Sequence, residues 1–359
     1  TATALLSKTE FDLSDYDTVV DQSGNYTPYQ NINLHKALAY TNSGTAMYGS
    51  GEVIAIMDDG YHVNGMGSSS THTEFSGKTI TSYDTSNFST YSSSSKWHGT
   101  FVASIAAGVF NDDGVAGVMG VAPEASLHLH SNATTGSASS YADWWATGTD
   151  DAKADGAVVQ NNSWGFDDSQ TANSNWAIND YVAYMNSNSL TASQTLAAHA
   201  SLDNDSNGYN DILASNTAAQ WDTYVASLNS FQDTGVIVFA LSNDSTDDDA
   251  DVSAALPELY SSLAEAWITV ANIDVTGTSS KTYTLKSAPC GSTAEYCLGA
   301  DGWKILGPGG NDYPVTGDGV NYYDYETSEG SSFAAPQVSG AIALLATHFP
   351  NHTPEKLAD

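Results

Sequence analysis

Three short stretches of the sequence place an acid, an imidazole and a hydroxyl at the ends of apolar segments. VIAIMDDG, residues 53–60, is a β-type run that ends in two aspartates and a glycine. WHGTFVASIAAG, residues 97–108, puts His98 at the entrance of a small-residue helix pattern, and EGSSFAAP, residues 329–336, puts two serines at the entrance of another. In nucleophilic acyl transfer a hydroxyl attacks, an imidazole takes its proton, and a buried carboxylate fixes the tautomer of the imidazole. The three stretches supply these groups.

Each stretch taken alone has an ordinary structural explanation. DDG is a common turn, HG is a common loop, and GSS is a common helix cap. Their combination is more specific, because the groups occur in the order Asp, His, Ser and each lies at the end of a strand or helix pattern. A serine at a helix N-terminus also gains from the exposed amides there, which stabilise nearby negative charge. We expect Pro336 in the first turn of this helix, where its missing N–H costs little.

The elements that must position these groups alternate between buried strands and helices. Alternation of this kind predicts an α/β fold, with a predominantly parallel central sheet and helices on both faces. The strand patterns lie at residues 53–58, 157–165, 235–243 and 267–274, and the main helix patterns at 99–110 and 331–349. The strand patterns end in polar residues, and sites in parallel sheets form beyond the carboxyl ends of the strands. These ends are Asp58, Asn162–Ser163, Asn243 and Asp274.

The chain divides into an irregular start and one large domain. We predict that residues 1–45 form an N-terminal extension that packs on a catalytic domain of residues 46–359. Residues 166–234 are rich in Asp, Asn, Ser and Ala, and we interpret them as an acidic insertion with helices near 176–188 and 216–230. No apolar run is long enough to span a bilayer, and any secretion signal is expected to be already missing.

The charge of the chain is strongly negative. There are 42 acidic residues against 9 lysines, with no arginine, and the formal net charge is −33. This balance argues against nucleic acid and anionic membranes as partners, because phosphate binding needs Lys and Arg. The acids can keep the protein hydrated in salty water, or bind hard cations such as Ca²⁺. The absence of arginine and the small number of prolines, with many Ser, Gly and Asp residues, also favour a marine or cold source.

The three stretches together resemble the subtilisin-like serine peptidases, over most of residues 40–350. VIAIMDDG is similar to the strand-Asp-x-Gly motif of that family, HGTFVASIAAG to its His-Gly-Thr helix, and GSSFAAP to its Gly-Thr-Ser-Met-Ala-x-Pro motif. The resemblance implies that Asp58 is the triad acid, His98 the base and Ser332 the nucleophile. It further implies a secreted endopeptidase of broad specificity that cleaves proteins and peptides through an acyl-enzyme and matures from its own propeptide.

Two further segments extend the resemblance to substrate binding. VFALSND, residues 238–244, looks like the strand that carries the oxyanion-hole asparagine of the family, which makes Asn243 the donor to the oxyanion. NNSWG, residues 161–165, resembles the segment whose backbone binds the peptide, so Ser163, Trp164 and Gly165 are expected to bind substrate. The family commonly has Gly where this chain has Ser242, on the rim of the same site.

One loop has the spacing of a calcium site. LDNDSNGYND, residues 202–211, offers oxygen ligands at loop positions 1, 3, 5, 7 and 9, with glycine at position 6 for the turn. The glutamate expected at position 12 is missing, so the alternative is a solvated acidic loop. The expected ligands of this structural Ca²⁺ are Asp203, Asp205, Asn207, the carbonyl of Tyr209, and Asp211.

Weaker metal candidates lie elsewhere in the chain. The acid runs at residues 110–114 and 243–251 could hold further calcium or stay solvated. His128 and His130 alternate along a strand pattern, and we interpret them as strand histidines and not as a zinc site, which needs more ligands.

The two cysteines, Cys290 and Cys297, enclose six residues that contain a glycine. A disulfide and a pair of free buried thiols are both compatible with this spacing, and expected secretion favours the disulfide. Their segment resembles one in subtilisin-like passenger domains of bacterial autotransporters, which implies a bacterial protein, secreted or on the cell surface, and we expect a monomer. Two other functions stay open: a maturation protease of narrow specificity, with Asp59 and Asp244 beside the site, and an inactive peptide-binding or adhesive module.

Overall fold

The computed structural model describes residues 28–42, 45–46, 48–61, 73–82, 96–110, 119–132, 140–165, 177–198, 216–277, 280–308 and 325–359. The proposed calcium loop at 202–211 and most of the acid run at 110–114 lie outside these residues.

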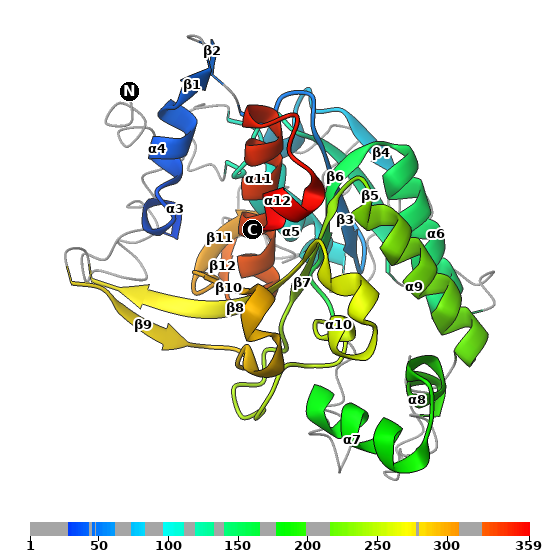
Figure 1. Cartoon of the computed structure of the whole chain (residues 1–359). Helices are drawn as coiled ribbons and strands as arrows, with labels where there is room; N and C mark the ends of the chain where they lie inside the picture. Colours follow the sequence, from blue (N-terminus) through cyan, green and yellow to red (C-terminus); the bar gives the residue numbers. More distant parts are fainter. Residues whose placement is uncertain are drawn as a thin grey trace, which may run out of the picture.

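A central sheet of eight strands forms the middle layer of the molecule (Figure 1). Its strands follow the order β10-β8-β7-β6-β3-β5-β4, and every neighbouring pair on this path is parallel. β9 pairs with β8 in the antiparallel direction. The predicted α/β fold with a predominantly parallel sheet is therefore confirmed. The bounds are β3 Val53–Asp58, β4 Ile80–Ser82, β5 Ser126–Ser131, β6 Ala157–Asn162, β7 Val236–Ala240, β8 Trp267–Thr276, β9 Thr282–Leu285 and β10 Cys297–Ala300.

Both faces of this sheet are apolar and buried. Along β7, Val236 and Val238 belong to one core cluster, while Ile237 and Phe239 belong to the other. Successive side chains of a strand point to opposite faces, so a strand that is covered on both sides must be apolar at every position. This is why the inner strands β3 and β7 read as continuous hydrophobic runs and not as alternating ones.

Two pairs of helices cover the two faces. Helices α5, Lys96–Ala107, and α11, Ser331–His348, pack against each other and against β3, β6 and β8. Helices α6, Tyr141–Ala154, and α9, Ala218–Gln232, lie side by side on the other face, at the right of Figure 1. The large side chains of α9, such as Trp221 and Phe231, are fully buried in the second core cluster. This helix falls within the sequence interpreted as an acidic insertion, yet it is a core helix.

The remaining elements surround this three-layer core. Near the N-terminus, Tyr29, Leu34 and Leu38 join the first core cluster, so the described part of the predicted extension packs on the sheet domain. The other bounds are α3 Pro28–Asn31, α4 Leu34–Ala39, β1 Thr41–Asn42, β2 Thr45–Ala46, η1 Thr73–Phe75, α7 Ile178–Asn188, α8 Ala192–Ala198, α10 Leu256–Leu259, η4 Ser261–Ala264, η5 Gly291–Tyr296, β11 Ile305–Pro308, β12 Tyr325–Ser328 and α12 Pro354–Ala358.

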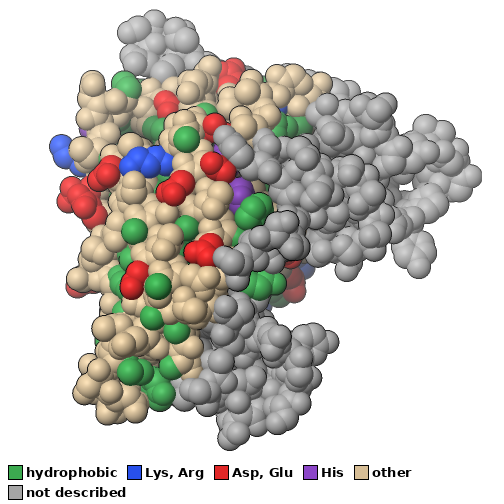
Figure 2. Space-filling view, turned by 90° about the vertical axis from the view of Figure 1, so that its right-hand side faces the viewer, with side chains coloured by type: hydrophobic (Ala, Val, Ile, Leu, Met, Phe, Trp, Pro, Cys, Tyr) green, Lys and Arg blue, Asp and Glu red, His purple; other side chains and the backbone are tan. Residues whose placement is uncertain are grey.

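The surface reflects the composition of the chain. On the face turned to the viewer in Figure 2, acidic side chains are scattered among polar and apolar ones, and lysines are few. Within the described ranges, no helix has both the length and the apolar content that crossing a membrane requires.

Candidate active site

The four residues predicted to do chemistry lie on or just beyond elements that meet at the carboxyl edge of the sheet. Asp58 is the last residue of β3, and Asn243 follows the end of β7. His98 lies in the first turn of α5, and Ser332 lies in the first turn of α11. Parallel strands bring their carboxyl ends to one edge of the sheet. The helices that follow these strands begin at the same edge. The topology thereby brings residues from four distant parts of the chain toward one region.

Asp58 and His98 form a direct pair. The Nδ1 atom of His98 lies 2.7 Å from Oδ1 of Asp58, and the carboxyl group of Asp58 is almost fully buried. Gly99 permits this approach, because a Cβ at that position would come within 2.4 Å of the carbonyl oxygen of Gly60. The glycine after the histidine therefore lets the start of α5 press against the end of β3, and this places the imidazole on the carboxylate.

The environment of His98 favours its protonated form. Burial acts to lower the pKa of the His98 imidazole, but the charge and the hydrogen bond of Asp58 raise it, and the charge of Asp59 raises it further. The net result is a pKa above the ordinary value of histidine. The side chain of Asp59 is exposed. Neighbouring atoms nevertheless remove part of the water around its carboxyl group, and this raises the pKa of Asp59, as does the charge of Asp58. A second carboxylate therefore faces solvent beside the imidazole.

The backbone of Ser332 is held by the side chain of Ser163, the residue that follows β6. Pro336 is the sixth residue of α11, so it lies in the second turn, and our expectation of the first turn is wrong. A proline there has no N–H to donate to the carbonyl oxygen of Ser332, four residues earlier. The Oγ of Ser163 donates to that oxygen instead, at 2.9 Å, and the Oγ of Ser332 donates to the carbonyl oxygen of Ser163 at 3.1 Å.

This exchange leads to a prediction about stability. The Ser163→Ala variant should lose about 1–3 kcal/mol, because it leaves the buried carbonyl of Ser332 without a donor. In the Pro336→Ala background the same change should cost less, since the alanine introduced there can supply the missing i→i−4 bond. Urea unfolding of the four proteins of this double-mutant cycle checks the coupling. Equal costs of Ser163→Ala in both backgrounds would show that the proline does not create the need for Ser163.

Sequence reasoning missed the polar network behind Ser163. The amide of Asn161 donates to Oγ of Ser163 at 2.8 Å, and Oγ of Ser339 donates to Oδ1 of Asn161 at 2.9 Å. Asn161 and Ser339 are fully buried. The available signal was the polar run NNS at the end of an otherwise apolar strand, because buried polar side chains require partners. The network joins β6 to α11 below Ser332.

Asn243 is oriented by Ser331. The Oδ1 atom of Asn243 accepts from the backbone N–H of Ser331 at 2.9 Å and from its Oγ at 3.0 Å. The Oγ of Ser331 also donates to the carbonyl oxygen of Leu241. Because both bonds engage the oxygen of the amide, the NH₂ group of Asn243 is the end available to another acceptor. The two adjacent serines thus differ in role, since Ser331 fixes a neighbouring amide.

The expected substrate segment follows directly from β6. The indole of Trp164 packs on Trp145 and Phe239, with ring centroids 4.7 Å and 5.7 Å apart, so this side chain turns toward the second core cluster. Gly165 lies against the loop after β7: a Cβ there would be 2.8 Å from Oγ of Ser253 and 3.4 Å from a carboxylate oxygen of Asp251. The segment therefore runs beside that loop, with its one large side chain turned into the core.

Ser242 lies in the loop on the other side of this contact. Its backbone N–H donates to Oδ2 of Asp251 at 2.7 Å, and its Oγ accepts from the backbone N–H of Asp244 at 3.1 Å. Asp244 in turn accepts from the backbone and hydroxyl of Thr246, and these bonds lower its pKa. The carboxylate of Asp244 is thereby engaged in its own turn.

The metal predictions find little support among the described residues. These residues contain no group of three or more His, Cys, Asp or Glu side chains that could hold a metal ion. In the acid run at 243–251, Asp244, Asp249 and Asp251 accept hydrogen bonds from N–H and O–H groups, which satisfy their oxygens without a cation. His128 and His130 are buried strand residues, bonded through Nδ1 to Asp155 and to the carbonyl of Ser131. Asp203, Asp205, Asn207, Tyr209 and Asp211 lie outside the described residues.

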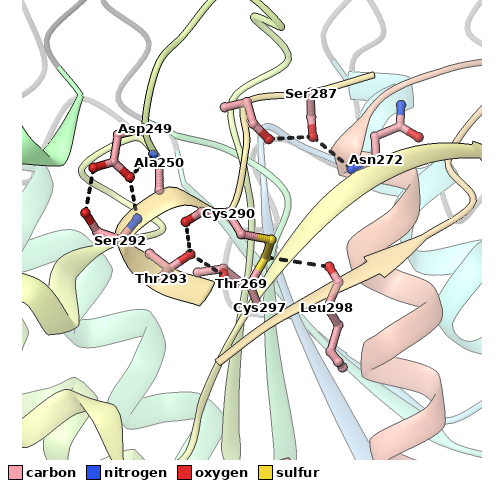
Figure 3. The surroundings of a disulfide bond; sticks show 11 residues. Asp249, Ala250, Thr269, Asn272, Ser287, Cys290, Ser292, Thr293, Cys297 and Leu298 are labelled. Carbon is pink, nitrogen blue, oxygen red and sulfur yellow. Dashed lines mark hydrogen bonds between the residues drawn. A yellow bond between two sulfur atoms is a disulfide. The ribbon is translucent and has the colours of Figure 1, made fainter. Parts of the chain in front are cut away.

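The expected disulfide is present. Cys290 and Cys297 are joined by an S–S bond, and the part of the chain that the structure describes has no free cysteine (Figure 3). The alternative of two free thiols is thereby excluded.

Comparisons with known proteins agree with this architecture. The sequence pattern of the subtilase family matches residues 49–359. The extracellular serine protease of Serratia marcescens is 26% identical in an alignment of 321 residues that covers 80% of this chain. The chain spans only 27% of the length of that relative.

Solved structures share the fold at low sequence identity. Sphericase superposes with a TM-score of 0.53 and 19% identity, covering 94% of this chain and 88% of its own. Fervidolysin from Fervidobacterium pennivorans, a keratinolytic enzyme related to subtilisin, gives a TM-score of 0.52 at 22% identity over 89% of this chain and 40% of its own. The prenylagaramide maturation protease PagA gives 0.52 at 18% identity, over 86% and 80%.

The family pattern covers most of the chain, and it includes the strand of Asp58, the helix of His98 and the helix of Ser332. The fold, the parallel sheet and the arrangement of these elements agree with it. The chain belongs to the subtilase family.

Proposed function

We propose that this protein is a serine endopeptidase that cleaves peptide bonds through an acyl-enzyme formed on Ser332. The observation that carries the proposal is the 2.7 Å contact between His98 Nδ1 and the buried carboxylate of Asp58, in a chain of the subtilase family. A carboxylate on Nδ1 fixes the tautomer in which Nε2 is unprotonated and can accept a proton. Ser332 is the second residue of the neighbouring helix α11, and the ring centroid of Phe333, the next residue, lies 5.5 Å from that of the His98 imidazole.

In the proposed reaction, the hydroxyl of Ser332 turns from the carbonyl of Ser163 toward Nε2 of His98. The imidazole takes the proton as Oγ attacks the peptide carbonyl, and it then gives the proton to the leaving amine. Asp58 stabilises the imidazolium formed between these steps. Water repeats the sequence on the acyl-enzyme, with His98 again acting first as base and then as acid.

Two donors are available for the negative oxygen of the tetrahedral intermediate. The first is the NH₂ group of Asn243, whose oxygen is held by Ser331. The second is the backbone N–H of Ser332, in the first helical turn, where N–H groups have no partner within the helix. The start of α11 also favours negative charge through its dipole. These donors are fixed before reaction, which is the condition for strong electrostatic stabilisation.

The pH dependence of peptide hydrolysis tests the role of His98. Activity should fall on the acid side as His98 becomes protonated, and the raised pKa places this limb above the ordinary histidine value. Asp59 raises the pKa of His98, so the Asp59→Asn variant should lower it. The neutral, active form then persists to lower pH, and the acid limb of log kcat/KM should shift toward acid.

The matched control for this profile is Asp233→Asn, an exposed carboxylate at the end of α9. It should leave the acid limb in place. An acid limb that does not move in Asp59→Asn, or that moves toward alkaline pH, would contradict the assignment of His98 as the base that Asp59 influences.

A second candidate is a maturation protease of narrow specificity that selects basic residues. One carboxylate favours it, since Asp59 is exposed beside His98, whereas Asp251, which lies against Gly165, already accepts hydrogen bonds from its own loop. No ion pair involving either carboxylate occurs with a lysine of the described residues. The neighbour PagA is itself a maturation protease by name. Cleavage of a peptide library separates the two candidates, since broad cleavage supports the first and exclusive cleavage beside Lys or Arg supports the second. No cleavage would favour an inactive binding module.

Secretion and calcium complete the proposal. The relative from Serratia marcescens is an extracellular protease by name, which supports secretion or display at the surface of a bacterium, and the autotransporter resemblance stays an expectation. Structural Ca²⁺ at residues 203–211 rests on the spacing of the oxygen ligands in the sequence alone. No step of the reaction depends on the ion. A propeptide, a monomeric state and a marine source likewise rest on the sequence.

A further inference from the structure

The loop that carries Ser242 and Asn243 is fastened to the disulfide loop by one buried carboxylate, that of Asp249. This side chain lies in an acid-rich stretch but is only 7% exposed. Its Oδ1 accepts from the backbone N–H of Ser292 at 2.6 Å, and its Oδ2 accepts from Oγ of Ser292 at 2.6 Å (Figure 3). The backbone N–H of Ala250 donates to Oδ1 at 2.8 Å. Asp249 thus spans two loops whose contact residues lie 43 positions apart in the sequence.

The disulfide loop is shaped to receive this carboxylate. Gly291 has a φ of +48°, and a Cβ at this position would come within 1.9 Å of Oδ1 of Asp249. Both facts require glycine, because other residues rarely adopt this conformation and the space is already filled. The Cys290–Cys297 bond closes the loop immediately around this contact.

The disulfide loop is in turn fixed to the central sheet. Thr293 donates to the carbonyl of Cys290 at 2.7 Å, and its hydroxyl lies 3.0 Å from that of Thr269 on β8. Cys297 begins β10, which pairs in parallel with β8. The loop is therefore a rigid support, and a group bonded to it is held relative to the sheet.

One further bond connects this support to the residue before Asn243, and two more hold that residue within its own loop. The backbone N–H of Ala288, two residues before Cys290, donates to the carbonyl of Ser242 at 2.8 Å. The backbone N–H of Ser242 donates to Asp251, which also accepts from the N–H of Ala254 at 3.1 Å. The backbone of Ser242 is therefore held at both its polar groups: its carbonyl by the segment that leads into the disulfide loop, and its N–H by the loop that Asp249 anchors.

We propose that Asp249 is a positioning residue that binds the 244–251 loop to the disulfide loop. It thereby sets the position of Asn243, whose NH₂ group donates a hydrogen bond to the oxyanion. The inference rests on the proposed function. The carboxylate of Asp249 accepts hydrogen bonds that join two loops, and it affects the reaction only by positioning Asn243. Displacement of a catalytic group by about 1 Å can cost about 10²-fold in rate, so a modest shift of this loop has a measurable effect.

The test is the Asp249→Ala variant in the full chain, assayed on a peptide p-nitroanilide. We expect kcat to fall about 10-fold or more, with KM changed by less than about 3-fold, because the lost interaction belongs to the transition state. Asp248→Ala is the matched control, since it removes the same charge from the exposed neighbouring position, and it should stay within about 2-fold of wild type.

Comparison with the Asn243→Ala background separates positioning from loss of structure. If Asp249 acts through Asn243, then Asp249→Ala should change kcat by less than about 2-fold once Asn243 is already alanine. General destabilisation would instead lower kcat by the same factor in both backgrounds, which overturns the proposal. A wild-type kcat in folded Asp249→Ala overturns it as well.

A milder variant covers failure to fold. Ser292→Ala removes only the bond to Oδ2 and keeps the backbone bond to Oδ1, so it should fold and lower kcat in the same direction, again only when Asn243 is present. A wild-type kcat in Ser292→Ala, together with an unfolded Asp249→Ala, would assign Asp249 to stability alone and overturn the proposal. Failure of the proposed function is distinct, because in that case Ser332→Ala would retain hydrolysis whatever Asp249 does.

Discussion

Replacing Ser332 by alanine is expected to lower kcat for peptide hydrolysis by about 10⁶-fold, the scale at which loss of the nucleophile acts in serine proteases of this type. The hydroxyl of Ser332 is the only group proposed to attack. The hydrogen bond from Oγ of Ser163 to the backbone carbonyl of Ser332 does not depend on that hydroxyl. The fold should therefore persist, and thermal unfolding should be close to that of wild type. Steady-state hydrolysis of a peptide p-nitroanilide, with active protein quantified separately, gives the ratio.

The same experiment on His98→Ala and on the double variant identifies a functional unit. Each single change should cost about as much as both together, because the hydroxyl and the imidazole act in the same step. Residual activity over water would come from the oxyanion donors and binding. Additive losses, or a Ser332→Ala enzyme with near-normal activity, would contradict the assignment of these two residues as nucleophile and base. Ser328→Ala on β12 serves as a serine control.

Replacing Asn243 by alanine is expected to lower kcat by about 10²–10³-fold, with little change in KM. Its amide oxygen accepts two hydrogen bonds from Ser331. Its NH₂ group is therefore the end that can donate a hydrogen bond to the negative charge that develops on the substrate. Loss of an interaction that exists mainly in the transition state reduces kcat and kcat/KM together.

Ser331→Ala provides the graded companion of this change. It removes the hydroxyl bond to Oδ1 but keeps the backbone bond, so the amide should stay in place but be held less firmly. We expect a smaller loss of kcat in the same direction. If Asn243→Ala raised KM and left kcat unaltered, the residue would be part of ground-state binding and not of an oxyanion site.

The candidate site residues could be picked out in the sequence because each belongs to a short local pattern. Asp58 ends an apolar strand, His98 and Ser332 begin small-residue helices, and these periodicities are visible within about ten residues. The α/β fold follows from the same patterns, since apolar strands that alternate with helices are covered on both faces. The spacing of Cys290 and Cys297 did not decide between a disulfide and free thiols, and only the expected secretion favoured the disulfide.

The supporting contacts could not be predicted, because they join residues far apart in the chain. Ser163 and Ser332 lie 169 positions apart, and nothing in either local sequence indicates that the serine just after β6 replaces the N–H that Pro336 lacks. The hydrogen bonds from Ser292 to Asp249 could not be predicted either, because an acidic run can be exposed to solvent, bind calcium or accept buried hydrogen bonds. The side chain of Asp249 was fixed by the glycine and serine of another loop.

Element packing was also beyond local reasoning in one helix. The acidic insertion was assigned from the composition of residues 166–234, which are rich in Asp, Asn, Ser and Ala, and α9 lies inside that stretch. The buried face of α9 carries large aromatic residues that pack on α6 and the sheet. Which face of such a helix is covered depends on its neighbours, and these are set by the topology.

The most direct test of the central claim is covalent labelling with a fluorophosphonate probe, with the modified residue located by peptide mass spectrometry. The account predicts labelling at Ser332 alone, abolished in His98→Ala because the hydroxyl then has no base. Parallel labelling in calcium and in EGTA also tests the proposed ion. Loss of labelling in EGTA supports a structural calcium ion, and unchanged labelling contradicts it. Labelling at another serine, or none in folded protein free of any propeptide, would contradict Ser332 as the nucleophile.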